Sequence, residues 1–170
     1  MEFSRFELSN GIRVVAVSRP KDTPFNIQIW FSCGSRAETD NKAGLAHFIE
    51  HMFFQGGQDF PNVESVNKEL WLLGENYDAG TGKEAVFYYI ITDLTYARRA
   101  AHILSDMLRF GRMNAREVQK QKGVILEELK MERDDPKEFS QAEFIRFIFG
   151  DSSLGRRILT PTKSGKSEIR

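Results

Sequence analysis

The sequence predicts an α+β domain in which a mostly antiparallel sheet carries helices on one face. Residues 9–11 read Ser-Asn-Gly between two short apolar runs, and Asn-Gly accepts the positive φ of a tight primed hairpin turn. Residues 25–33 alternate apolar and polar side chains, as expected for a strand with one buried face. Other segments have helical periodicity and follow residues that can cap a helix.

The strands are all expected before residue 93. Two hairpins and one single strand account for them: residues 6–8, 12–17, 25–33, 78–83 and 86–92. The Asn-Gly turn joins the first two segments, and the last two form a second hairpin-like pair. A sheet built from such pairs is antiparallel.

Each expected helix follows a residue whose side-chain oxygen can accept a hydrogen bond from the free N–H groups of the first helical turn. The expected caps are Asp40 or Asn41, Asn62, Thr95, Asn114 and Asp135. Glu117 completes a capping box for the fourth helix, and Pro136 suits the first position of the fifth. Gly74 should end the second helix, and the helix that begins near Thr95 should continue to about Phe110.

Charge and composition exclude several classes of partner. The 170 residues carry 24 basic and 24 acidic side chains, so nothing indicates electrostatic capture of nucleic acid or of an anionic membrane. No apolar run is long enough to span a bilayer, and no signal-peptide core follows Met1. The single cysteine excludes an internal disulfide. These features predict a soluble, cytoplasmic protein.

Residues 47–51 read His-Phe-Ile-Glu-His, which is the inverted order of the zincin motif His-Glu-x-x-His. On a helix, His47 and His51 lie on one face, and Glu50 lies beside them. Two neutral imidazoles are good zinc ligands, and a carboxylate that is not itself a ligand can take a proton from a metal-activated water. The motif therefore predicts a metal site with Glu50 as general base.

A zinc site of this kind needs a third protein ligand. His102 lies in a segment of helical periodicity where it packs or faces water, and Cys33 reads as a small buried residue at a strand end. A carboxylate further along the chain is a better candidate. Glu127 and Glu128 interrupt an otherwise apolar helical run, but periodicity alone does not choose between them.

The chain resembles the M16 metallopeptidases, also called inverzincins or the pitrilysin family. The resemblance extends from residue 6 to about residue 162 and is carried by residues 8–15, 34–38 and 43–56. The position of the family's third ligand, a glutamate, corresponds to Glu128, which implies one zinc per chain. Many relatives carry an acidic residue where this chain has Gln121, so the resemblance implies a less anionic surrounding and weaker metal binding.

The resemblance also identifies a substrate-binding segment. Relatives usually have Asn-Ala-x-Thr followed by a Tyr-Tyr strand, and this chain has Asp78, Ala79, Thr81 and Tyr88 at the matching positions. Aspartate thus replaces the usual asparagine. By resemblance, an extended peptide adds to the edge of residues 78–83, where Ala79 and Thr81 present backbone groups.

Residues 1–160 are expected to form one M16-like catalytic domain, followed by a polar C-terminal tail of residues 161–170. Relatives continue with a helix, a completing strand and a second domain of similar fold, so this domain is expected to be incomplete. The fifth helix contains Phe139, Phe144, Phe147 and Phe149. A core-facing stripe is the preferred interpretation, and an interface is the alternative.

The resulting prediction is a zinc-dependent endopeptidase that hydrolyses extended peptides and works as a homodimer or with a heteromeric partner. One alternative is a catalytic-type half, or partner subunit, of a split M16 complex that is active only when assembled. A second alternative is a structural zinc site, although such a site normally has four protein ligands and only three are identified.

Overall fold

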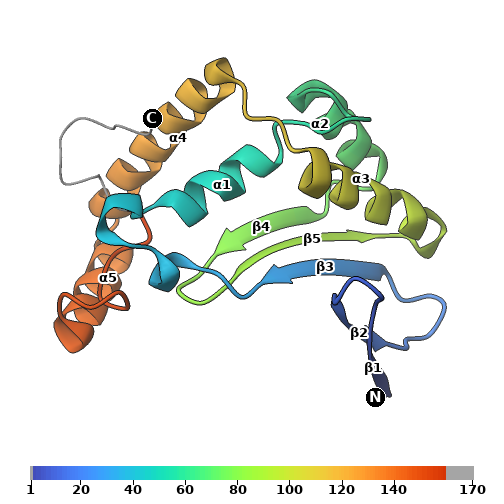
Figure 1. Ribbon diagram of the computed structural model, residues 1–170, viewed down its shortest axis with the longest axis horizontal. Helices are drawn as coiled ribbons and strands as arrows, with labels where there is room; N and C mark the ends of the chain where they lie inside the picture. The colour runs from blue at the N-terminus through green and yellow to red at the C-terminus, as the bar shows by residue number, and fades with distance from the viewer. Residues whose placement is uncertain (1, 160–170) are drawn as a thin grey trace.

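A three-stranded antiparallel sheet lies at the centre of the molecule (Figure 1). The computed structural model describes residues 2–159. In the sheet, β5 (Val86–Thr92) lies between β3 (Phe25–Phe31) and β4 (Tyr77–Thr81). The β4–β5 hairpin and the strand at residues 25–31 therefore confirm the sequence prediction.

The alternation of side chains along β5 gives the sheet two different faces. Val86, Tyr88 and Ile90 are buried on one face, while Phe87 and Tyr89 are only partly buried on the other. A strand turns successive side chains to opposite sides, so the buried set marks the face that meets the helices.

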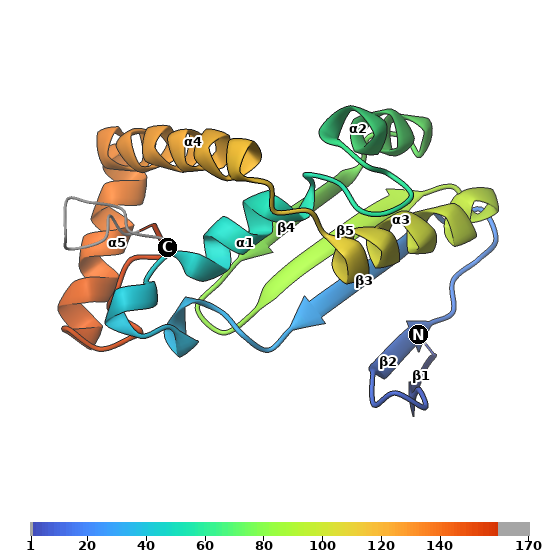
Figure 2. The same ribbon diagram turned by 45° about the horizontal axis from the view of Figure 1, so that its top comes forward.

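Three helices cover that buried face (Figure 2). They are α1 (Leu45–Phe53), α2 (Val63–Leu72) and α3 (Ala97–Phe110). The residues with exposed fractions of 1% or less in the core come from α2, α3 and β5: Val66, Leu70, Ile90, Ala100, Ile103, Leu104 and Met107. The predicted α+β class, with helices on one face of an antiparallel sheet, is confirmed.

The remaining helices extend beyond one end of the sheet (Figure 1). The longest helix of the described chain, α4 (Ala115–Asp134), lies against α1, and α5 (Pro136–Phe149) packs against α4. Among the described residues, no helix combines the length and the apolar character that crossing a bilayer requires.

The N-terminal hairpin stands apart from the central sheet (Figure 2). Within the described residues, β1 (Phe3–Glu7) and β2 (Arg13–Val17) pair only with each other. The hairpin is confirmed, but its turn is not a primed two-residue turn. Leu8 N donates to Ile12 O, Gly11 N donates to Leu8 O, and Gly11 has a φ of 84°. This is the longer loop with a glycine bulge.

The expected caps are right for three helices and wrong for two. Asn62, Asn114 and Asp135 each accept backbone N–H groups at the start of their helices. In place of Thr95, a short 3-10 turn, Leu94–Tyr96, leads into α3, and Asp93 accepts the Thr95 N–H. Asp40 and Asn41 lie in another 3-10 turn and do not cap α1. The carboxylate of Glu38 accepts the N–H groups at the start of α1 instead.

Two burial predictions are also wrong. Cys33 is exposed, and α5 has no buried residue, with exposed fractions of 62% for Phe144 and 86% for Phe147. Periodicity identifies a helix but does not show whether another element covers its apolar residues. The predicted polar tail, residues 161–170, lies outside the described residues.

Candidate metal centre

Helix α1 presents His47 and His51 on one face because they are four residues apart. Phe48, Met52 and Phe53 are buried, and Phe53 stacks on Tyr88 of β5, which fixes the rotation of the helix. The two imidazole rings consequently lie edge to face, with centroids 4.6 Å apart. The predicted pairing of the two histidines is present.

The start of α1 is held by a residue that local sequence patterns do not identify. Gly44 at the N-cap has a φ of 87° and no side chain, and Glu38 supplies the missing acceptor. The carboxylate oxygens of Glu38 accept the Gly44 N–H at 2.8 Å and the Ala46 N–H at 2.6 Å. A negative charge at a helix N-terminus also interacts favourably with the helix dipole.

Helix α4 brings the third expected ligand to the two histidines. Oε2 of Glu128 lies 3.3 Å from His51 Nε2 and 3.8 Å from His47 Nε2. The neighbouring Glu127 points elsewhere, because its side chain is 68% exposed and accepts a hydrogen bond from Lys130 at 2.7 Å. The structure thus brings Glu128, and not Glu127, to the histidine pair.

The electrostatics of the pair favour the form of imidazole that binds metals. Burial lowers the pKa of His47, the neighbouring His51 lowers it further, and Glu128 partly opposes both effects. Neutral imidazole is the ligand form. His51 Nδ1 lies 3.2 Å from Gln121 Oε1, whereas the buried His47 Nδ1 has no hydrogen-bond partner within residues 2–159. Gln121 therefore occupies the position from which it can orient His51.

Glu50 lies close to the histidines, and its carboxylate accepts a hydrogen bond from strand β4. Potential ligand atoms of His47, Glu50 and His51 lie within 4.8 Å of one another. The Thr81 hydroxyl of β4 donates a hydrogen bond of 2.5 Å to Glu50 Oε2. Burial raises the pKa of Glu50, while the bonds and charges of Thr81 and His51 lower it and Asp78 raises it again. A raised carboxyl pKa suits a group that must take up a proton.

This donor set suits zinc. Two imidazole nitrogens and one carboxylate oxygen converge, which is the ligand count of catalytic zinc sites that leave a position for water. The histidine side chains are 15% exposed and that of Glu128 is 37% exposed, so the cluster has an open side. Among the described residues, the cluster of potential ligand atoms within 4.8 Å of one another consists of His47, Glu50 and His51, and Glu128 approaches both histidines from α4.

The residues expected to bind substrate lie on two strands, β4 and β5, and differ in how exposed they are. Ala79 and Thr81 lie on β4, which pairs only with β5 in the described part of the chain and so has one free edge. Asp78 is exposed and accepts the N–H of Ala79. Tyr88 is only 3% exposed and stacks on Phe53, with ring centroids 3.8 Å apart. The structure therefore does not bring the Tyr88 ring to the free edge, and its expected role stays a prediction.

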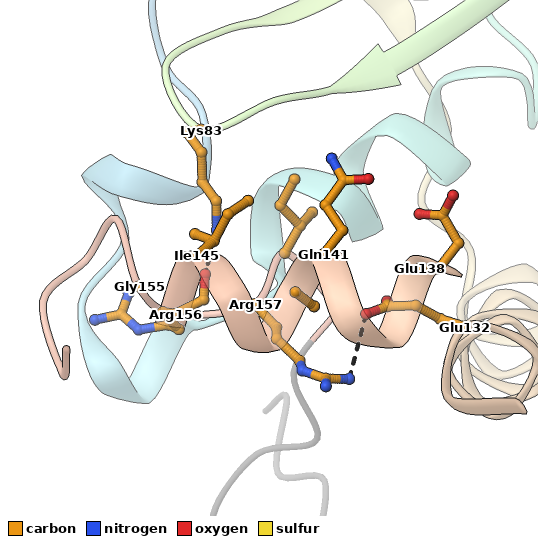
Figure 3. Close-up of a pocket in the computed structure, with 10 residues that line it drawn as sticks. Lys83, Glu132, Glu138, Gln141, Ile145, Gly155, Arg156 and Arg157 are labelled. Carbon is orange, nitrogen blue, oxygen red and sulfur yellow. Dashed lines mark hydrogen bonds and ion pairs between the residues drawn. The ribbon is translucent and has the colours of Figure 1, made fainter. Parts of the chain in front are cut away.

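A cavity of about 190 Å³ lies next to the β4–β5 turn, between that turn, α5 and residues 155–158 (Figure 3). Lys83 reaches across it and donates to Arg156 O, while Arg157 bonds Glu132 at 3.3 Å and Glu143 at 2.9 Å. These residues were not predicted from the sequence, since oppositely charged residues far apart in a chain carry no local signal.

The segment after α5 also supports the metal helix. Arg156 donates to the carbonyl of Glu38 at 2.8 Å and to Asp40 Oδ1 at 2.7 Å. Because the Glu38 carboxylate caps α1, residues separated by more than one hundred positions help to hold the histidines. The side chain of Arg156 is 17% exposed, so this contact is partly shielded from solvent.

Comparisons with known proteins identify the family of the chain. Residues 13–162 match the model of the Insulinase family, peptidase family M16. The zinc protease YmxG of Bacillus subtilis is 32% identical over 91% of this chain and 38% of its own length. The mitochondrial-processing peptidase subunit beta of Dictyostelium discoideum is 32% identical over 96% of this chain and 34% of its own length.

The crystal structure of a peptidase M16 inactive domain from Pseudomonas fluorescens has the same fold. It aligns with a TM-score of 0.81 and 17% identity, over 96% of this chain and 40% of its own. The present chain spans about a third of the length of the two curated relatives. The family match covers most of its residues, and the chain belongs to peptidase family M16.

Proposed function

We propose that the chain is the zinc-bearing part of an endopeptidase that hydrolyses extended peptides. The observation that carries the proposal is the approach of Glu128 Oε2 to Nε2 of both His47 and His51, while Thr81 engages Glu50 separately. Three residues would hold one zinc ion, and a fourth would remain for proton transfer. The names of relatives such as YmxG support zinc as the metal.

The proposed mechanism assigns one task to each group. His47, His51 and Glu128 would hold the zinc ion, which would supply Lewis-acid chemistry to a water molecule and to the scissile carbonyl. Glu50 accepts the water proton at the carboxylate oxygen that Thr81 does not engage, and later delivers the proton to the leaving amine. His51 keeps Nε2 directed at the cluster because its Nδ1–H can donate to Gln121.

The free edge of β4 supports an extended peptide as substrate. A peptide that pairs with this strand gains main-chain hydrogen bonds, which give affinity with little dependence on side chains. The backbone of Ala79 and Thr81 would then align the peptide beside Glu50. A folded protein cannot present such a strand without local unfolding, so flexible peptides are the proposed substrates.

A second candidate is a subunit that becomes active only after assembly with a partner. It is favoured by the exposed aromatic residues of α5. The mitochondrial relative is itself named as a subunit. In this version the metal site is the same, but peptide hydrolysis requires a second polypeptide.

Replacing Glu50 with glutamine tests the proposal. Glu50→Gln should retain zinc and lose on the order of a hundredfold or more in peptide hydrolysis, because it removes the proton acceptor but no ligand. Glu127→Gln is the matched control and should retain both properties, since Glu127 is exposed. Equal hydrolysis by Glu50→Gln and wild type, both with zinc bound, would refute Glu50 as the base.

Zinc-loaded wild type that hydrolyses no flexible peptide alone, but does so when a second M16 chain is added, would establish the subunit version. Zinc-loaded wild type that is inactive under both conditions would contradict the proposed peptidase function. Metal content and hydrolysis should therefore be measured on the same samples.

A further inference from the structure

The contact between β4 and α1 joins the free strand edge to the carboxylate of the metal motif. Thr81 is the last residue of β4 and pairs with Val86 in β5. Because alternate residues of a strand share a face, its side chain lies on the helix-covered side together with Ala79. The Thr81 hydroxyl thereby reaches Glu50 Oε2 at 2.5 Å, across 31 positions of sequence.

Thr81 itself is held firmly. Gly82 N donates to Ala85 O at 2.8 Å and closes the hairpin directly after it. The carbonyl of Gly82 accepts the Ser35 N–H at 3.1 Å, so a second segment fixes the same turn. A side chain on such a support can hold a neighbour in one orientation, as a functional group on a rigid element does.

Glu50 needs such a constraint. Its carboxylate lies near enough to His47 and His51 to compete for a metal, because their potential ligand atoms fall within 4.8 Å of one another. A carboxylate that moved onto the metal would close the position that water requires. A hydrogen bond to one oxygen opposes that movement and leaves the other oxygen available.

We propose that Thr81 is a positioning residue that holds Glu50 beside the metal cluster but out of the ligand set. This inference deepens, and rests on, the proposed peptidase function. It also connects substrate binding to the base: a peptide that pairs with the free edge of β4 contacts the backbone of the residue whose hydroxyl orients Glu50. The sequence resemblance assigns Thr81 only backbone groups, so the role of the hydroxyl is additional.

Two substitutions separate the hydroxyl from the shape of the side chain. Thr81→Val keeps the branched β-carbon and removes the hydroxyl, whereas Thr81→Ser keeps the hydroxyl. Thr92→Val is the matched control in the same sheet, because Thr92 is buried and its hydroxyl has no hydrogen-bond partner within residues 2–159. Wild type and the three variants should be compared at equal zinc content.

The first readout does not depend on activity. In zinc-free protein with ¹³C-labelled glutamate, the side-chain carboxyl resonance of Glu50 is assigned by its loss in Glu50→Gln. Thr81→Val should shift this resonance, Thr81→Ser should keep it near the wild-type position, and Thr92→Val should not move it. An unshifted resonance in Thr81→Val would overturn the proposal, even if the protein proved to be no peptidase.

The second readout is the separation of kcat from KM for a flexible peptide. Thr81→Val should lower kcat by about tenfold to a hundredfold with little change in KM, because misplacement of a reacting group impairs chemistry. Thr81→Ser should recover most of the loss. Adding Thr81→Val to Glu50→Gln should cost little more, since the two residues act as a unit. Unchanged kcat in Thr81→Val would overturn the positioning role.

Discussion

Helices α1 and α5 both carry phenylalanines, but the protein uses them in different ways. α1 is short and buries Phe48, Met52 and Phe53, of which Phe53 stacks on Tyr88 of the sheet, and it also carries the histidine pair. α5 is longer and has no buried residue, so that Phe147 is 86% exposed. The metal site thus rests on a packed core, whereas α5 lies outside it.

The difference shows that apolar residues along a helix do not reveal which element or molecule covers them. For α1 the partner is the central sheet of the same chain. On α5, Phe144 and Phe147 are 62% and 86% exposed, and exposed apolar patches commonly mark interaction surfaces. Substitutions in the two regions should therefore differ in what they change, namely folding in the first and association in the second.

The largest effect on stability is expected in the core between the helices and the sheet. Leu70 on α2 is 1% exposed, and Leu70→Ala should lower the free energy of unfolding by about 2–5 kcal/mol, because it removes buried methyl groups and leaves a cavity. Leu126→Ala on α4 is the matched control, since Leu126 is 53% exposed. Urea denaturation would measure both. Equal losses in the two variants would contradict the assignment of the core.

A smaller loss is expected from the polar anchor beside the core. Asp106 on α3 is 3% exposed and accepts the backbone N–H groups of Gln58, Asp59 and Phe60. Asp106→Asn should cost about 1–3 kcal/mol, because an amide group would face these donors. Asp22→Asn, at an exposed position, should be neutral. If Asp106→Asn unfolds at the same urea concentration as wild type, the carboxylate does not anchor this loop.

The smallest effect on stability is expected at α5. Phe147→Ser should change the free energy of unfolding by no more than about 0.5 kcal/mol, since the side chain is already in solvent. The same substitution should weaken association, which sedimentation velocity measures over a range of protein concentrations. Identical sedimentation of the variant and wild type at every concentration would show that Phe147 contributes to no interface of this chain with itself.

Local patterns predicted the elements of the fold well. The Asn62, Asn114 and Asp135 caps, and the alternation along β3, depend on neighbouring residues and are therefore readable from the sequence. The cap of α1 was not readable, because Glu38 reaches it from outside the helix and Arg156 holds Glu38 from the other end of the domain. Tertiary contacts of this kind leave no periodic signal.

In the candidate site too, some features could be predicted from the sequence and others depend on tertiary contacts. The four-residue spacing of His47 and His51 was sufficient to predict their shared face. The choice of Glu128 over Glu127 required either the family spacing or the structure, because adjacent residues on a helix differ only in the direction in which they point. The hydrogen bond from Thr81 to Glu50 depends on how a strand meets a helix and was not predicted.

The most direct test of the metal site is a measurement of bound zinc in two adjacent variants. Wild type should bind about one zinc per chain, and Glu128→Gln should lose most of it, because one of three ligands is removed. Glu127→Gln should bind as much as wild type, since its side chain lies in solvent beside Lys130. Full retention of zinc by Glu128→Gln, with loss in Glu127→Gln, would contradict the site described by His47, His51 and Glu128.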